Sequence, residues 1–174
     1  NTYTGINTGQ PFPAVAANEN LWLGSSSPAE LTVADNNSVN VGVKFRSDKD
    51  GIIKGIRFYK GSSANGGTHI GSLWSQSGTL LASATFINET SSGWQEILFA
   101  SPVSVTANTT YIASYFLPLG NYSRNGDYFV TQYSNGNSLT ALSNTESPNG
   151  VYGYNSQSGF PGNSAGAHNY WVDV

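Results

Sequence analysis

Two segments of the sequence combine aromatic rings with amide and guanidinium groups, which together can bind sugars. Residues 120–125 hold an aromatic ring, a guanidinium group and two amides, and residues 149–174 hold five aromatic side chains but only one charged side chain. A ring face packs against the C–H groups of a sugar, while amide and guanidinium groups hydrogen-bond its hydroxyls. These features predict a neutral polysaccharide ligand. The candidate ligand-binding residues are Asn121, Tyr122, Arg124, Asn125, Tyr152, Tyr154 and Phe160.

Each candidate ring also has a purely structural alternative. Most aromatic side chains in a β-rich sequence pack in the core. Rings in strand-like segments, such as Tyr115 and Trp171, are expected to be core residues, and Tyr122 could fix its loop by packing beneath it. A binding site predicts exposed, coplanar rings in a groove, whereas a structural role predicts complete burial of Tyr122, Tyr152 and Tyr154.

Calcium is the metal for which the sequence offers ligands. Asp48 and Asp50 lie in a turn-forming segment, where their carboxylates and nearby backbone carbonyls could supply the oxygen ligands that Ca²⁺ requires. The alternative is an ordinary turn in which the aspartates bond backbone amides. His69 and His168, the only two histidines, lie far apart in the sequence, so a histidine-rich transition-metal site is not expected.

The catalytic patterns in the sequence do not predict an enzyme. Residues 162–166 match the G-x-S-x-G pattern of serine hydrolases, but too few residues follow for the helix, acid and histidine that such a nucleophile needs. Glycoside hydrolysis requires two carboxylates that face each other, and spacing selects no pair among the 10 acidic residues. We expect a noncatalytic domain.

Composition favours an extracellular domain. The 174 residues include no cysteine and 20 glycines, only 10% are charged, and the net charge is -3. Low charge combined with abundant small polar residues is common in secreted bacterial modules, and the acidic balance argues against nucleic acid as a partner. No apolar stretch approaches the roughly 20 residues that span a bilayer, so membrane insertion is not expected. We expect a secreted or cell-surface monomer.

Alternating hydrophobic residues predict an all-β fold. Residues 40, 42, 44 and 46 alternate with Val39, Val41, Val43 and Phe45, which predicts a half-buried strand with one face in the core and the other in water. Residues 47–51 have the composition of a turn, so this strand and the extended pattern that follows are expected to form a hairpin. Strands are predicted over 39–46, 52–59, 70–74, 80–86, 94–99, 103–105, 110–116, 128–131 and 170–174.

Glycine, proline and asparagine interrupt these short strands at intervals typical of a sandwich or barrel. We assign residues 31–174 to one such domain. Residues 1–30 are less regular, and we expect them to form either an N-terminal extension or an edge strand through residues 21–23.

Several segments together resemble one bacterial family. They are residues 43–51, 55–61, 69–74, 93–94, 110–111, 113–115, 149–152, 160–161 and 169–174. They are similar to the family catalogued as domain of unknown function 4082, whose members occur in large secreted or surface-anchored bacterial proteins, beside immunoglobulin-like repeats and sometimes beside carbohydrate-active modules. The resemblance covers about residues 31–174. It implies a noncatalytic antiparallel β-sandwich of jelly-roll type, similar to galactose-binding domains.

Jelly-roll modules often hold a structural calcium between the ends of the chain, and by this resemblance Glu19 and Asp173 join Asp48 and Asp50 as candidate metal ligands. The resulting hypothesis is a carbohydrate-binding module. The alternative is a structural or adhesive spacer of a large surface protein, which contacts neighbouring domains, has no glycan ligand and could be stabilised by calcium.

Overall fold

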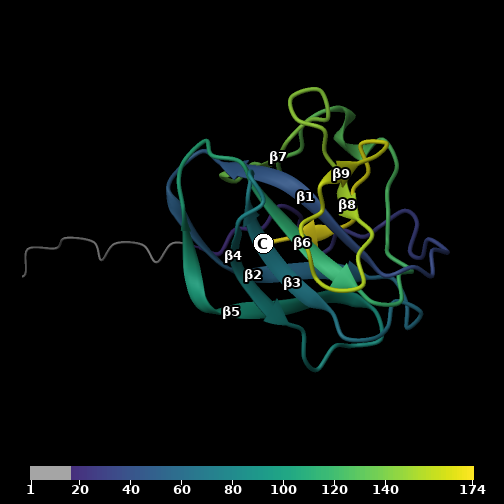
Figure 1. Ribbon diagram of the computed structural model, residues 1–174. Coiled ribbons are helices and arrows are strands. Elements are labelled where there is room, and N and C mark those ends of the chain that lie inside the picture. Colours follow the sequence, from purple (N-terminus) through teal and green to yellow (C-terminus); the bar gives the residue numbers. More distant parts are fainter. Residues whose placement is uncertain (1–16) are drawn as a thin grey trace, which may run out of the picture.

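Two antiparallel β-sheets stack against each other in the computed structural model, which describes residues 17–174 (Figure 1). The strands are β1 (Val39–Ser47), β2 (Gly51–Lys60), β3 (Ile70–Ser75), β4 (Leu80–Thr85), β5 (Gly93–Val105), β6 (Tyr111–Leu117), β7 (Leu139–Ala141), β8 (Val151–Gly153), β9 (Asn163–Ser164) and β10 (Val172–Asp173).

The larger sheet has seven strands in the order β4-β3-β6-β1-β8-β9, with β7 also paired to β1, and the smaller sheet has the order β10-β2-β5. The predicted all-β antiparallel sandwich is therefore confirmed, whereas its jelly-roll arrangement stays a prediction. Among the described residues, no helix has the length and apolar character to cross a membrane.

The core lies between the sheets and contains the predicted apolar face of β1, but the other face of β1, predicted to be in water, is largely covered too, since Asn40 is 1% exposed. Val39, Val41, Val43 and Phe45 of β1 are all buried, with 0–1% of each exposed. Their cross-strand partners on β6 are buried as well, because partners in an antiparallel pair point to the same face. From the opposite sheet, the ring of Phe58 stacks on that of Tyr115 with their centroids 4.1 Å apart, which closes the core.

The predicted hairpin between β1 and β2 is wrong. β1 pairs with β6, β7 and β8, whereas β2 pairs with β5 and β10 in the other sheet. A turn-forming sequence specifies that the chain reverses, but it does not specify that the two strands hydrogen-bond to each other. Contacts with the loop after β5 hold this turn, where Asp50 accepts a hydrogen bond from Ala107 N at 2.8 Å and Ser47 O accepts one from Asn108 N at 2.7 Å.

Smaller differences concern the short elements. Residues 128–131, predicted as a strand, instead contain the 3-10 helix η1 (Tyr128–Val130), and the two strands predicted over 94–99 and 103–105 form the single strand β5. The last strand contains only Val172 and Asp173. Strands β7, β8 and β9 were not predicted, because two or three residues carry too few alternations to be recognised.

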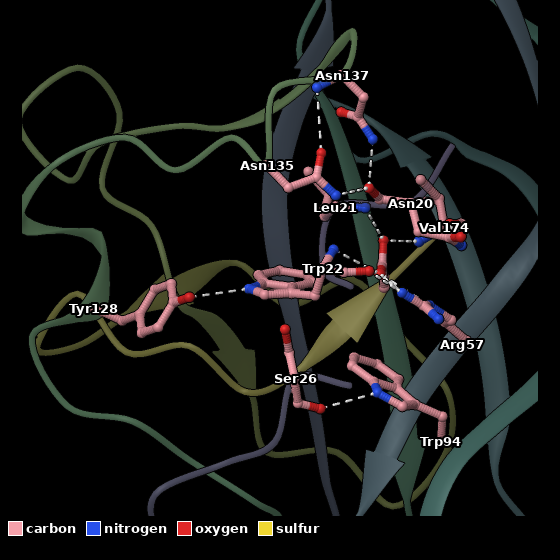
Figure 2. Close-up of polar contacts among 11 residues, drawn as sticks. Asn20, Leu21, Trp22, Ser26, Arg57, Trp94, Tyr128, Asn135, Asn137 and Val174 are labelled. Carbon is pink, nitrogen blue, oxygen red and sulfur yellow. Dashed lines mark hydrogen bonds and ion pairs between the residues drawn. The ribbon is translucent and has the colours of Figure 1, made fainter. Parts of the chain in front are cut away.

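The start of the described chain packs against its end. The carboxylate of Asp173 accepts hydrogen bonds from Leu21 N at 2.6 Å and Trp22 N at 3.1 Å, and Arg57 donates to the same carboxylate from Nε and Nη2 at 2.9 and 2.7 Å. Arg57 also bonds the carbonyl of Trp22, and Figure 2 shows its side chain reaching toward this segment. The residues between 17 and 30 therefore pack onto the sandwich, although residues 21–23 form no strand. Residues 1–16 lie outside the described part of the chain.

Trp171 lies among several aromatic rings and has an unusual backbone conformation. Its φ is 57°, in the left-handed region that a bulky residue rarely adopts. Three hydrogen bonds hold it there: its N donates to Asn169 Oδ1 at 2.7 Å, its Nε1 donates to Asn125 Oδ1 at 2.9 Å, and its O accepts from Tyr59 N at 3.0 Å. As a result both Trp171 and the preceding Tyr170 are buried, with 2% and 4% of each exposed.

Candidate functional site

A cavity of about 230 Å³ brings together four tyrosines that come from three separate segments. Its floor is apolar and belongs to β1. Its walls come from the segment after β6, from β8 with the residues that follow it, and from the segment before β10. We call it the tyrosine cavity. It is lined by Val39, Val41, Tyr122, Arg124, Tyr152, Tyr154, Ala165, His168 and Tyr170.

Backbone pairing explains why these residues meet. Tyr152 is the cross-strand partner of Val41 in the β1–β8 pair, so its ring points to the same face of the sheet as Val41. Tyr122 and Arg124 are placed by an antiparallel bridge between Glu30 and Arg124 and by the hydrogen bond from Val33 N to Tyr122 O at 2.9 Å. The segment before β1 therefore positions the side chains of the segment after β6.

The four rings pack at steep angles and differ in exposure. The rings of Tyr122 and Tyr170 have centroids 5.2 Å apart at 83°, and those of Tyr152 and Tyr154 are 5.8 Å apart at 74°. Tyr122 and Tyr170 are 9% and 4% exposed, whereas Tyr154 is 54% exposed. Neither alternative drawn from the sequence holds in full, because the paired rings are not coplanar and Tyr122 is buried, whereas Tyr154 is exposed.

The exposed ring of Tyr154 is fixed in place by Asp35. Its hydroxyl donates a hydrogen bond of 2.6 Å to Asp35 Oδ2, while Asp35 Oδ1 accepts hydrogen bonds from N and Nδ2 of Asn37, both at 3.0 Å. The bond to Asp35 raises the pKa of Tyr154 to about 12. Partial burial acts to raise the pKa of Asp35, but the hydrogen bonds from Tyr154 and Asn37 outweigh it and lower that pKa. An aromatic face is thus held rigid in contact with solvent.

Arg124 is oriented by Glu30. Both Nε and Nη2 of Arg124 donate to Glu30 Oε2, at 3.0 and 2.8 Å, and the side chains are partly exposed. Within residues 17–174, Nη1 of Arg124 makes no hydrogen bond, so it can donate to a ligand. The ion pair also balances the positive charge beside the cavity.

His168 contributes a nitrogen without a partner. Its Nδ1 is buried and has no hydrogen-bond partner among the described residues. Burial lowers the pKa of His168, and the positive charge of Arg124 lowers it further. The imidazole is therefore neutral at pH 7, and it adds a hydrogen-bonding group to a cavity that is otherwise mostly aromatic and apolar. Its ring packs edge-on against Tyr170, with the centroids 5.9 Å apart.

Four of the predicted ligand-binding residues line this cavity, namely Tyr122, Arg124, Tyr152 and Tyr154. His168 and Tyr170 also line it and were not predicted as ligand-binding residues. Their only signal in the sequence is their place in the aromatic C-terminal segment, because the positive φ of Trp171 breaks the strand alternation that would have indicated which way they point.

The two predicted asparagines hold the protein together instead of lining the cavity. Asn121 has a φ of 62° and donates from Nδ2 to Leu119 O at 2.9 Å and to Ala64 O at 3.3 Å. Asn125 Oδ1 accepts hydrogen bonds from Ala29 N at 2.8 Å and from the indole of Trp171 at 2.9 Å. Both amides therefore fix loops.

Phe160 lies on the other face of the larger sheet. Its ring packs edge-on against Trp74, with centroids 5.7 Å apart, in a small cluster with Ile112 and Val151. Neighbouring residues of a strand point to opposite faces, so Val151 points to this cluster whereas Tyr152 points into the cavity. Phe160 and the tyrosine cavity are thus on different sides of β8.

The four candidate calcium ligands do not come together in one group, and three of them hydrogen-bond to other parts of the protein. Asp173 is bound to Arg57, and Glu19 accepts hydrogen bonds from Lys49 Nζ at 3.0 Å and from N and Oγ of Ser138, which lower the pKa of Glu19. Asp50 bonds a backbone amide. Across residues 17–174, no group of three or more histidine or acidic side chains is arranged to hold a metal ion. Asp48 and Asp50 thus remain the candidates whose carboxylates face no cation in the described structure.

A larger cavity of about 520 Å³ lies between residues 17–20 and β2. Its lining contains charged residues such as Lys49, Lys54 and Glu96 and aliphatic residues such as Ile52 and Leu98, but no aromatic ring. Without a ring face to cover the C–H groups of a sugar, this cavity fits the predicted ligand less well than the smaller tyrosine cavity does.

These features define the class of the protein as an all-β sandwich domain with a tyrosine-lined cavity at its surface. Its sequence matches the family described as Domain of unknown function (DUF4082) over residues 25–172, so the chain belongs to this family. No curated protein matches the chain.

Proposed function

We propose that this domain is a noncatalytic carbohydrate-binding module of a secreted or surface-exposed bacterial protein, and that it binds a neutral polysaccharide in the tyrosine cavity. The observation that carries the proposal is the meeting of four tyrosines from three segments with an available nitrogen of Arg124 and an unpartnered nitrogen of His168. Rings and hydrogen-bonding groups at one site are what a polyhydroxylated ligand requires.

The charge balance supports a neutral ligand. Arg124 is paired with Glu30, His168 is neutral, and the hydroxyl of Tyr154 keeps its proton because its pKa is raised. The rigid, exposed ring of Tyr154 offers a stacking face that loses little conformational entropy when a sugar binds.

The absence of carboxylates from the cavity lining supports a noncatalytic role. Glycoside hydrolysis requires two carboxyl groups on either side of the bond that is cleaved. The nearby Asp35 and Glu30 are both engaged, one with Tyr154 and the other with Arg124. The residues that line the cavity can therefore bind a sugar but do not supply an acid and a nucleophile.

The test is binding of the purified chain to soluble and insoluble neutral polysaccharides, such as cellulose, xylan, mannan and starch, with millimolar calcium and with a chelator. We expect retention on one class of glycan. Tyr154→Ala should weaken that binding by about 1 to 3 kcal/mol, because it removes the exposed stacking face. Ile87→Ala is the matched control, because Ile87 is 65% exposed and does not line the cavity.

A structural or adhesive spacer is the second candidate, and one observation favours it. Tyr122 and Tyr170 are buried and pack against each other, as rings do when they only stabilise a loop. If no polysaccharide is retained and Tyr122→Ala lowers the melting temperature, the spacer becomes the better proposal. Loss of retention with the chelator would add calcium to the binding function.

A further inference from the structure

We propose that the tyrosine cavity binds the end of a glycan chain, so that one terminal sugar unit enters it and the rest of the chain leaves on one side. This inference rests on the proposed function and specifies which part of a polysaccharide is recognised. Three features carry it: the angles between the rings, the size and floor of the cavity, and the gradient of exposure among the tyrosines.

The ring angles do not suit the middle of a glycan chain. Several consecutive sugar units bind to rings that lie coplanar along a groove, because each ring face must cover one unit. Here Tyr122 and Tyr170 meet at 83°, and Tyr152 and Tyr154 meet at 74°. A ring that meets its neighbour edge to face forms a wall instead of continuing a platform, so the rings surround a small volume.

The size and floor of the cavity suit a single unit. Its volume of about 230 Å³ is below the roughly 300 to 1,000 Å³ of pockets that hold drug-sized ligands. Val39 and Val41, which line it, are 1% and 0% exposed and belong to the central part of the larger sheet. A chain cannot continue through this paired strand, so a sugar that enters the cavity is expected to be the last of its chain.

The exposure of the tyrosines gives the direction in which the chain leaves. Tyr122 and Tyr170 are almost fully buried, Tyr152 is half-buried, and Tyr154 is 54% exposed. The two buried rings line the cavity together with His168, and they form its less accessible part. The exposed face of Tyr154 lies at the outer end and can cover the second sugar unit.

Oligosaccharides of increasing length test the inference directly. We would titrate the 174-residue chain with gluco-, xylo- and manno-oligosaccharides of one to six units and measure binding by calorimetry. In the series that binds, we expect the affinity to rise from one to two units and then to change by less than about threefold up to six units. A further rise beyond threefold between two and six units would overturn the inference, because it would show that the chain runs along the surface.

The number of chain ends gives an independent readout. Cutting a soluble polysaccharide of the same series with an endo-acting hydrolase increases the number of ends at constant mass. We expect the number of binding sites per gram to rise in proportion to the ends. An unchanged or falling number of sites would contradict recognition of chain ends.

A variant that fills the cavity separates this inference from the proposed function. Ala165 lines the cavity and is exposed, so Ala165→Leu should reduce binding at least about tenfold without lowering the melting temperature. Ala100→Leu is the control, because Ala100 is exposed on β5 and does not line the cavity. Binding that survives Ala165→Leu but is weakened by Tyr154→Ala would refute the chain-end inference and leave the proposed function standing. If the unmodified chain binds no neutral glycan, the proposed function itself fails.

Discussion

Arg57 and Asp173 form a buried ion pair that joins β2 to β10, with Nη2 and Oδ2 2.7 Å apart. Only 10% of the Arg57 side chain and none of the Asp173 side chain is exposed. The same carboxylate accepts hydrogen bonds from the backbone amides of Leu21 and Trp22. Asp173, which the family resemblance suggested as a calcium ligand, therefore has its partners within the protein. The guanidinium group occupies the position that a cation would need.

Breaking this pair should cost the protein much of its stability. We expect Asp173→Asn to lower the free energy of unfolding by about 3 to 5 kcal/mol, because the guanidinium group of Arg57 would be left buried without its counter-charge. Urea denaturation measures the loss. The control is Glu146→Gln in the exposed pair with Arg46, where about 0 to 1 kcal/mol is expected. Similar losses in both variants would contradict the special role of the buried pair.

Gly120 should be sensitive to any side chain. It has a φ of 62°, and a Cβ at this position would lie 1.8 Å from the backbone oxygen of Asp35. Gly120→Ala is therefore expected to displace Asp35 and to destabilise the protein by more than about 1 kcal/mol. Gly136→Ala isolates the steric part of this effect, because Gly136 also has a positive φ but has open space around it. Equal losses in the two variants would show that backbone strain alone is responsible.

Tyr154 should titrate at unusually high pH. Its pKa of about 12 results first from the hydrogen bond to Asp35, whose carboxylate accepts a hydrogen bond from the neutral phenol but repels the phenolate. Asp35→Asn is expected to bring the pKa of Tyr154 back toward the usual value of about 10. NMR titration of the labelled tyrosine ring can follow the change. An unchanged pKa in the variant would argue that the contact does not persist in solution.

Acid should weaken the fold through His69. This residue is fully buried, with Nδ1 2.7 Å from Glu89 Oε1 and Nε2 2.8 Å from Asn65 Oδ1. Burial lowers the pKa of His69, although the contact with Glu89 acts in the opposite direction. The unfolded chain therefore binds a proton at higher pH than the native protein does. The contribution of His69 to stability is full above pH 6.5, the ordinary pKa of histidine, and it is lost as the pH falls from there toward the lowered pKa.

The measurement is the free energy of unfolding between pH 5 and pH 8, by urea denaturation. His69→Gln should reduce the slope of stability against pH below pH 6.5. His168→Gln serves as a comparison, because burial also lowers the pKa of His168 and its share of the slope must be separated. A slope that His69→Gln leaves unchanged would mean that other groups cause the acid sensitivity.

The sequence predicted the two central strands from different signals. The alternation of Val39, Val41, Val43 and Phe45 is strong enough to locate β1, whereas β6 is a nearly continuous apolar run whose seven residues are all buried. It could not predict which strands share a sheet, and β1 and β2 belong to different sheets despite the turn between them. Pairing depends on contacts between distant segments, which local patterns do not encode.

Only part of the candidate site was predicted, because local patterns also do not show which distant residues meet. The types of residues pointed to Tyr122, Arg124, Tyr152 and Tyr154, since rings and polar groups suit sugars. Phe160 is also aromatic but lies on the other side of β8. The sequence could not show this, because a strand of three residues is too short to reveal which residues share a face until its pairing with β1 is known.

The contact between the two ends of the described chain has a mechanical consequence. Asn20 donates from Nδ2 to the carbonyl of Val174 at 2.7 Å, beside the bonds from Leu21 and Trp22 to Asp173. If neighbouring domains pulled on the chain from both sides, the force would enter and leave the sandwich at this one corner. The tension would then load the ion pair of Arg57 with Asp173 and the few hydrogen bonds that join residues 20–22 to the last two residues.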